Sequence, residues 1–237
     1  MLFRSNTRRS AVFLPIPGTP ESVRRSLLLI ARARASTERW ERIPRAVRGP
    51  IWLTQSADWQ WVWQVNVMGV VRSLQALVPG MLRQQGPSHI VITSSIMGFA
   101  GGPTSVYGTS KHAVSRIAEG LHHDLIAIGA PIGVTLLCPG AIATQLMLSE
   151  RNRPAHLAGT SDGVDGLSER TAAHQYFQTD GSAPSIVAAA AVDAIERNRF
   201  FAFPASDATP HVEARLADIR EDRAPRLLPL TMTSGEP

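Results

Sequence analysis

The sequence predicts an α/β fold with a parallel sheet, and the arrangement of short apolar runs and longer helical patterns supports this fold class. Residues 89–93 and 132–137 are short β-branched or apolar runs, which are typical of buried strands. Apolar residues recur at helical spacing over 58–83, and residues 106–128 form a second helical pattern. Because this second helix lies between the two strands in the chain, the order predicts parallel pairing through a crossover helix.

The ends of these elements are marked by residues that break regular structure or carry hydroxyl groups. Gly129 is suited to end the second helix. Ser94-Ser95 follows the first strand, and Pro139-Gly140 follows the second. Ligands of parallel sheets bind beyond the carboxyl ends of the strands, so these two turns indicate where a site would lie.

The remaining segments are less regular. Residues 145–182 are polar with little periodicity, so we expect either a mobile lid over a site or disorder. Residues 185–197 predict an alanine-rich helix, and 200–203 predict a last short strand. We expect residues 206–237 to form a C-terminal tail.

Composition favours one globular domain in a chain of 237 residues, since 44% of them are hydrophobic and 18% are charged. No uninterrupted apolar run approaches the ~20 residues that span a bilayer, so we predict no membrane partner. Cys138 is the single cysteine, which rules out an intrachain disulfide. It is expected to be a packed, inert thiol. A chain without disulfides fits a reducing compartment, and we expect a cytoplasmic protein.

Residues 1–49 differ from the rest of the chain. They hold eleven arginines and three acidic residues, without a strand or helix period apart from a possible basic helix over 21–42. Such a start can resemble an organelle transit peptide or a nucleic-acid-binding tail. No aromatic side chains interleave with the arginines as stacking platforms, and we therefore predict no nucleic-acid partner. We expect a basic leader that is disordered or not native to the protein.

Tyr107 and Lys111 form the first candidate catalytic pair. Lys111 is the only lysine of the chain. It lies four positions after Tyr107, so the two side chains share one helix face. Lowering the pKa of a tyrosine by about three units requires roughly 4 kcal/mol of preferential phenolate stabilisation. A cation at roughly 4 Å supplies about that much at an effective dielectric constant near 20. The pair is therefore suited to acid–base chemistry.

Two further polar residues precede this pair. Ser95 lies just past the first strand, where its hydroxyl is suited to bind a substrate carbonyl oxygen and orient it toward Tyr107. Asn66 stands in an apolar helix, and a buried amide requires a partner. We expect it to hold a water molecule or a backbone carbonyl in a proton path behind Lys111.

These residues fall within motifs that resemble those of the classical short-chain dehydrogenase/reductase family over residues 50–205. The matching motifs are Asn66-Val67-Met68-Gly69, Ser94-Ser95-x-x-Gly98, Tyr107-Gly108-Thr109-Ser110-Lys111, and Pro139-Gly140 with Thr144. The resemblance implies a Rossmann-type, doubly wound parallel sheet. It also implies reversible hydride transfer between NAD or NADP and a small-molecule alcohol or carbonyl substrate.

The resemblance assigns a role to each catalytic residue. Tyr107 is the acid–base, while Lys111 lowers its pKa and binds the nicotinamide ribose. Ser95 polarises the substrate carbonyl, and Asn66 supports the proton relay. No metal site is predicted.

The resemblance also implies a cofactor contact by Tyr107 and by the turn after the second strand. The sharp turn of Pro139 and Gly140 and the hydroxyl of Thr144 suit contacts to the nicotinamide carboxamide or the diphosphate. In the family, helices equivalent to 58–83 and 106–128 pair across a dimer interface, so we expect a homo-oligomer.

The sequence departs from the family pattern at two places that matter for function. Ser95 is one residue closer to Tyr107 than is common, and the commoner spacing falls on Ser94. Before Gly49 the only glycine is Gly18, so the Gly-rich turn that approaches the cofactor pyrophosphate is missing. The N-terminal half of the family fold is therefore expected to be absent, through truncation, a wrong start or a shifted reading frame. The alternative function is a catalytically inactive fragment that acts as a dimerising or interaction protein.

Overall fold

The computed structural model describes the backbone of residues 27–30 and residues 51–84, 86–100, 106–157, 164–226 and 228, with no side-chain description at 53 and 164–170. Its sheet has four parallel strands in the order in which they occur in the chain. They are β1 (Leu27–Ile30), β2 (Ser88–Thr93), β3 (Ile132–Leu137) and β4 (Phe201–Ala202).

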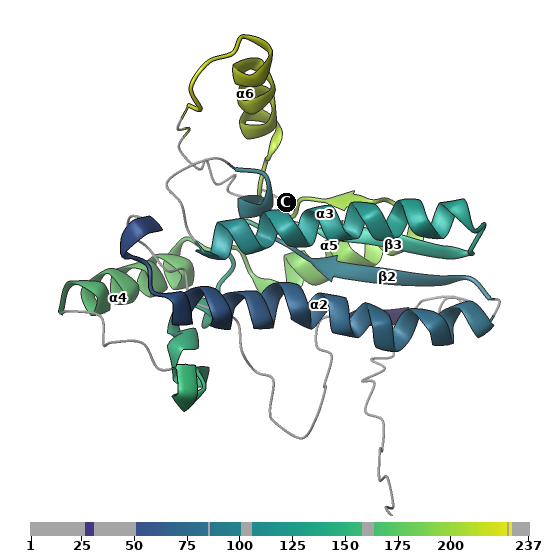
Figure 1. Cartoon of the computed structure of the whole chain (residues 1–237), viewed down its shortest axis with the longest axis horizontal. Helices are drawn as coiled ribbons and strands as arrows, with labels where there is room; N and C mark the ends of the chain where they lie inside the picture. The colour runs from purple at the N-terminus through teal and green to yellow at the C-terminus, as the bar shows by residue number, and fades with distance from the viewer. Residues whose placement is uncertain are drawn as a thin grey trace, which may run out of the picture.

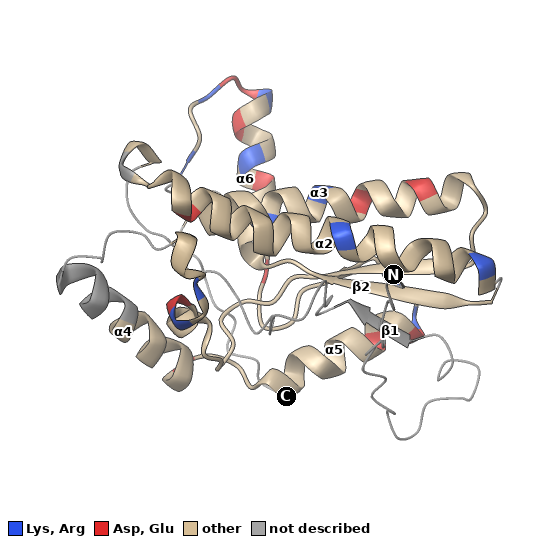
Figure 2. Ribbon diagram, turned by 60° about the horizontal axis from the view of Figure 1, so that its bottom comes forward, with Lys and Arg blue, Asp and Glu red and all other residues tan. Residues whose placement is uncertain are grey.

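Helices cover both faces of this sheet, as expected for a doubly wound α/β fold. Helices α2 (Ser56–Gln84) and α3 (Val106–Ala127) lie side by side on one face, and α5 (Pro184–Glu196) lies on the other (Figures 1 and 2). The predicted fold class is confirmed. The strand 132–137 has its predicted bounds, and the helices 58–83 and 106–128 differ from α2 and α3 by one or two residues at an end. Gly129, at a φ of 63°, ends α3 as predicted.

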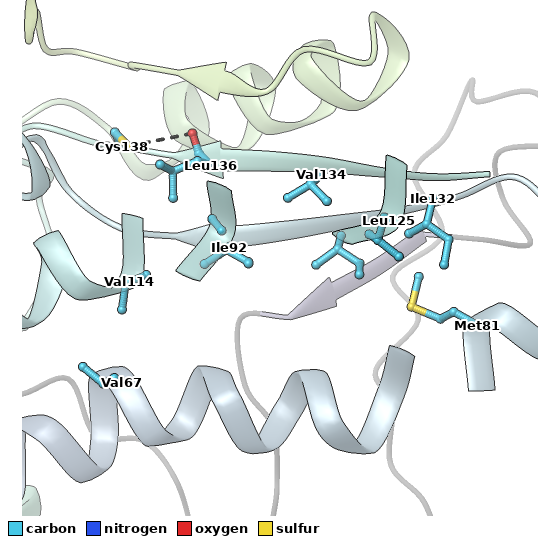
Figure 3. Packing of buried hydrophobic residues seen from close by; sticks show 11 residues of the cluster. Val67, Met81, Ile92, Val114, Leu125, Ile132, Val134, Leu136 and Cys138 are labelled. Carbon is cyan, nitrogen blue, oxygen red and sulfur yellow. Dashed lines mark hydrogen bonds between the residues drawn. The ribbon is translucent and has the colours of Figure 1, made fainter. Parts of the chain in front are cut away.

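Successive side chains of a strand point to opposite faces of the sheet, and this explains why helices cover both faces. Ile90 and Ile92 of β2 belong to the core cluster beneath α2 and α3. Val91, between them, packs with Leu137 and with Ala194 of α5 on the opposite face. Figure 3 shows the first cluster, in which side chains from both helices meet the strands. Full burial of each Val, Leu or Ile side chain contributes roughly 1.5–3 kcal/mol, so this two-sided packing fixes the sheet between its helices.

One strand lies where sequence analysis predicted none. β1 belongs to the arginine-rich segment 1–49, and it pairs in parallel with β2 through the register Leu27 to His89 and Ile30 to Ile92. The prediction of no strand in that segment is therefore wrong at these four residues. The apolar run was too short to show a period, and its strand conformation depends on pairing with β2. The other residues of segment 1–49 lie outside the described residues, and these include 21–26 and 31–42 of the stretch where a basic helix was considered.

Helices also occur in segments for which no helix was predicted. The polar stretch 145–182 contains three: η3 (Leu146–Asn152), η4 (Ala155–Leu157) and α4 (Val164–Thr179). The stretch 206–237, predicted as a tail, contains α6 (Thr209–Arg220), which projects away from the sheet in Figure 1. These helices lack a clear apolar stripe, which is the signal that sequence analysis depends on.

Helix α2 is long and apolar on average, although polar residues interrupt every apolar run in it. By length and composition alone it would be able to cross a membrane, although one such helix is weak evidence because the core helix of a soluble protein passes the same test. In the structure α2 buries Trp61, Val62 and Val67 against its neighbours. Only 22% of its most apolar window is buried, however, so much of the helix surface remains uncovered in the single chain.

A buried histidine links the amino-terminal ends of the strands. Nε2 of His89 lies 2.7 Å from Oγ1 of Thr135, and this hydroxyl donates to the carbonyl of Arg199 at 2.7 Å. Because the one hydroxyl proton of Thr135 is used in that bond, Nε2 of His89 acts as the donor to Thr135. Burial lowers the pKa of His89 to about 4, so the neutral ring is the stable form in the folded protein.

This burial predicts a loss of stability in acid. The pKa of His89 is about 4 in the folded chain, against 6.5 for an ordinary histidine, so between these pH values the unfolded chain binds the proton more readily. The free energy of unfolding therefore decreases by up to about 3 kcal/mol as the pH falls from 6.5 toward 4. Urea unfolding of the wild type and of His89→Gln at several pH values measures this effect.

The substitution His89→Gln is expected to weaken the pH dependence of the free energy of unfolding between pH 4 and 6.5. His123→Gln, at an exposed position of α3, serves as the matched control and is expected to leave the dependence unchanged. Equal acid sensitivity of the wild type and His89→Gln would contradict the assignment.

Candidate active site

The loop after β2 packs unusually closely against α3. A Cβ atom placed on Gly98 would lie 2.5 Å from Oγ of Ser115 and 2.7 Å from Oγ of Ser94, so no larger residue fits without movement. The Ser94 hydroxyl donates to the backbone carbonyl of Lys111 at 3.1 Å and lies 2.9 Å from the Ser115 hydroxyl. Ser94 therefore attaches the loop to the helix backbone.

Ser95, the next residue, faces the candidate catalytic tyrosine. Its side chain caps the short helix η2 (Ile96–Gly98) by accepting the Met97 N–H at 3.2 Å, and it forms a hydrogen bond with the Tyr107 side chain. It also donates to the carbonyl of Pro139 at a long 3.5 Å. Of the two serines considered for the catalytic position, Ser95 reaches the tyrosine, while Ser94 binds the helix backbone.

Tyr107 is half-buried at the first turn of α3, where burial dominates its acidity. Burial raises the pKa of its phenol, and the hydrogen bond with Ser95 offsets part of that rise. The expected lowering of this pKa by Lys111 is therefore not found in the chain by itself. The reason is that the loss of hydration outweighs the hydrogen bond with Ser95.

Lys111 lies beneath the tyrosine with its amino group buried. Nζ donates to the carbonyl of Thr93 at 3.0 Å and lies 5.6 Å from the centroid of the Tyr107 ring. Burial lowers the pKa of Lys111 to about 8, so the group stays mostly protonated at neutral pH. A protonated amine at this distance from an aromatic ring forms a cation–π contact.

Asn66 reaches the same pair through a residue that sequence analysis did not single out. Nδ2 of Asn66 donates to Oγ of Ser110 at 2.8 Å, and this hydroxyl donates to the backbone carbonyl of Tyr107 at 2.7 Å. Ser110 thus joins α2 to the first turn of α3. Its signal was its position three residues after Tyr107, where a serine hydroxyl can bond the i−3 carbonyl.

The turn after β3 is joined to this group through Pro139. The carbonyl of Pro139 accepts the N–H of Ile96 at 3.1 Å, besides the Ser95 hydroxyl. Gly140 lies against the C-terminal segment, where a Cβ atom would meet the carbonyl oxygen of Ala205 at 2.3 Å. The carbonyl of Thr144 accepts from Nε2 of Gln178 on α4 at 2.9 Å. The described contacts of Gly140 and Thr144 are thus to these other segments and not to Tyr107.

Cys138 packs next to the pair as a buried thiol. Burial raises its pKa to about 12, although the positive charge of Lys111 acts in the opposite direction. A thiol with this pKa is a poor nucleophile near neutral pH, which agrees with its prediction as a packed, inert residue.

A parallel α/β sheet that holds a serine, a tyrosine and a lysine together at the carboxyl ends of its strands is typical of nicotinamide-dependent oxidoreductases. The family model described as short chain dehydrogenase matches residues 45–155. A solved short chain dehydrogenase/reductase from Burkholderia phymatum, described as a complex with NAD, is 30% identical and superposes with a TM-score of 0.75. The match covers 87% of this chain and 70% of that one. The chain belongs to the short-chain dehydrogenase/reductase family.

Curated relatives match over most of this chain but over less of their own length. A "CLA biosynthesis dehydrogenase/reductase" of Lactiplantibacillus plantarum is 29% identical over 184 residues, 76% of this chain and 64% of the relative. A "C alpha-dehydrogenase" of Sphingobium sp. strain SYK-6 is 31% identical over 178 residues, 75% of this chain and 57% of the relative. The chain therefore spans less than two thirds of these relatives.

The close approach at Gly140 predicts a large effect of a small substitution. Gly140→Ala places a Cβ against the backbone of Ala205 and is expected to destabilise the fold by about 1–3 kcal/mol. Gly120→Ala on α3 is the matched control, because its Cβ meets nothing closer than 3.9 Å. It is expected to stabilise the helix by roughly 0.5–1 kcal/mol. Urea unfolding at one fixed pH measures both, and equal effects would contradict the packing described.

Proposed function

We propose that this chain transfers a hydride between a nicotinamide cofactor, NAD or NADP, and an alcohol or carbonyl substrate, with Tyr107 as the acid–base. The observation that carries the proposal is a packed group of three side chains, of which Ser95 and Lys111 are buried and Tyr107 is half-buried. The Tyr107 hydroxyl bonds Ser95 on one side, and the amino group of Lys111 lies 5.6 Å from its ring centroid on the other. The membership of the chain in an oxidoreductase family supports the same reaction class.

In this proposal the proton chemistry belongs to Tyr107. In the direction of reduction, its hydroxyl gives a proton to the substrate oxygen as the carbonyl carbon gains a hydride; oxidation runs the same steps in reverse. The Ser95 hydroxyl binds that oxygen and holds it next to the phenol. Lys111, mostly protonated at neutral pH, stabilises the phenolate that remains after the proton has left.

The donor set beneath the tyrosine fits the ribose end of a nicotinamide cofactor, which supplies or accepts the hydride when bound. An ammonium group has three N–H donors, and one of those on Lys111 goes to the Thr93 carbonyl. The other two are oriented away from that bond and suit ribose hydroxyls. We place the carboxamide or diphosphate at Pro139, Gly140 and Thr144.

The diphosphate end of the site fits less well. The Gly-rich turn that approaches a pyrophosphate is missing before Gly49. Several charge-assisted hydrogen bonds of about 1.5–3 kcal/mol each would be lost with it, so we expect weak cofactor binding.

Asn66 supports the reaction by position. Its amide reaches Tyr107 through Ser110, so it fixes the first turn of α3 relative to α2. We propose that this connection is how Asn66 supports the proton relay behind Lys111.

The test begins with binding. Titration with NADH and with NADPH, followed by nicotinamide fluorescence, is expected to show saturable binding of one of them, and it separates NAD from NADP as the preferred cofactor. Absence of binding at millimolar concentrations of both would overturn the enzymatic function for this chain.

Replacement of the tyrosine then tests the acid–base role. Tyr107→Phe is expected to lower kcat by about 10²–10⁴-fold while leaving cofactor affinity nearly unchanged, because only the proton transfer is lost. Tyr176→Phe changes the other tyrosine of the chain, which is exposed on α4, and is expected to leave kcat unchanged. Retained turnover in Tyr107→Phe would exclude the role.

The two serines provide a second comparison. Ser95→Ala is expected to lower kcat/KM, because it removes a contact to the substrate oxygen, and to lower stability by about 0.5–2 kcal/mol, because it removes the cap of η2. Ser94→Ala is expected to destabilise the fold, because it removes the bond to the Lys111 carbonyl in a buried position.

A second candidate function is a dimerising protein that binds a second copy of itself or a full-length relative. The specific observation that favours it is the uncovered surface of α2, whose most apolar window is 22% buried. Val65, Met68 and Val71 lie on α2 at helical spacing, are partly exposed, and do not belong to the packed clusters of the described residues. Pairing of α2 and α3 with the same helices of another copy would cover them.

Sedimentation velocity over a range of protein concentrations tests this assembly. The wild type is expected to form a dimer or larger oligomer. Met68→Glu is expected to shift the equilibrium to the monomer by placing a charge in an apolar interface. Gln84→Glu adds the same charge at an exposed position at the end of α2, on the opposite side of the helix from Met68, and serves as the control. A wild-type chain that is monomeric at all concentrations would overturn the dimerising function.

A further inference from the structure

A buried ion pair joins the segment after β3 to the first turn of α2. Nη1 of Arg153 lies 2.5 Å from Oδ1 of Asp58. The two side chains are only 4% and 10% exposed, which is unusual for charged groups. Arg153 lies between η3 and η4, and 95 residues separate it from Asp58 in the sequence. The contact is therefore tertiary.

Further contacts of the guanidinium group organise the segment around it. Arg153 also contacts Glu150, with Nη1 3.3 Å from Oε1, and its Nε donates to the carbonyl of Leu157. The guanidinium carbon lies 5.2 Å from the ring of Trp61, which belongs to the turn of α2 that follows Asp58. One side chain thus contacts two residues of its own segment, Glu150 and Leu157, and two residues of the helix.

The energetics of this pair point to a geometric role. Removing two charges from water costs several kcal/mol per ion, and apolar residues of similar volume often stabilise a fold as well as a buried pair does. Nη2 of Arg153 and Nε1 of Trp61 are buried without hydrogen-bond partners in the structure as described, which adds to the cost. A pair that is costly in this way contributes most by specifying one arrangement of the segment.

That arrangement adjoins the candidate active site. The segment begins just after Thr144, and Figure 1 shows it beside the start of α2, at the end of the sheet where α3 also begins. Asn66 lies on α2 about two turns after Asp58, so the helix that carries the ion pair also carries the link to Tyr107.

We propose that Arg153 is a positioning residue whose ion pair with Asp58 holds the segment Leu146–Leu157 on the first turn of α2 and so sets the closed cover of the substrate site. The part of this inference that concerns substrate rests on the proposed oxidoreductase function. The ion pair itself does not depend on it.

Hydrogen exchange followed by mass spectrometry tests the ion pair on the whole chain. The backbone N–H groups of Leu148, Arg153 and Leu157 are hydrogen-bonded within the segment, so their exchange reports its opening. Arg153→Met and Asp58→Asn are each expected to speed this exchange on the order of 100-fold. Arg153→Met leaves the buried Asp58 carboxylate unpaired, and Asp58→Asn leaves Arg153 with only the partly exposed Glu150 as its partner. Exchange within β3 is expected to stay unchanged, which shows that the fold is intact.

Three further variants separate the ion pair from a general effect of substitution. The double variant Asp58→Asn/Arg153→Met is expected to exchange more slowly than the product of the single effects, since both members of the buried pair are removed together. Arg153→Lys, which keeps the charge, is expected to restore part of the protection. Arg151→Met is the matched control, because Arg151 is exposed and bonds Leu148 and Gln145 within its own segment. It is expected to behave as the wild type.

Exchange in Arg153→Met equal to that of the wild type, or additive effects in the double variant, would overturn the ion-pair role.

If turnover is detected, Arg153→Met is expected to raise the KM for substrate about tenfold with kcat within a factor of about three, because substrate positioning is lost while Tyr107 is retained. A loosened segment with an unchanged KM would overturn the substrate part. If the chain binds no cofactor, the proposed function fails, while the exchange experiment still decides the ion pair.

Discussion

The close contact between the loop after β2 and the first turns of α3 is the constraint on which the site depends. Gly98 permits it by having no side chain, and Ser94 maintains it by bonding the helix backbone at Lys111. Because this approach fixes where α3 begins, Ser95 reaches the Tyr107 hydroxyl and the Lys111 amino group reaches the Thr93 carbonyl. A looser loop would separate the serine from the tyrosine by more than a hydrogen bond allows.

The same contact shifts the pKa values of Tyr107 and Lys111. Bringing α3 onto the strand ends buries both side chains, so the pKa of Tyr107 rises and that of Lys111 falls. Each shift disfavours the charged form of its group. A tyrosine with a raised pKa holds its proton firmly until another group stabilises the phenolate. The side chains of Tyr107 and Lys111 are therefore held next to one another in the isolated chain.

Away from the candidate site, two segments join the sheet and helices through unusual contacts. Strand β1 comes from an arginine-rich segment, yet it continues the parallel sheet at β2. The segment after β3 is attached by a buried charge pair, where apolar contacts would be the ordinary means. Both features lie outside the pairing of β2 with β3, whose register runs without interruption from Ser88 and Ile132 to Thr93 and Leu137.

The sequence alone determined the elements with a strong period and the residues with unusual chemistry. Strands β2 and β3, helices α2, α3 and α5, and the candidates Ser95, Tyr107 and Lys111 were all identifiable from periodicity and motifs, because these signals are local. The path from Asn66 through Ser110 and the pairing of Arg153 with Asp58 were decided by the tertiary structure. The physical reason is that each depends on contacts between segments far apart in the chain, and burial, which sets the pKa of each group, exists only after those segments have packed.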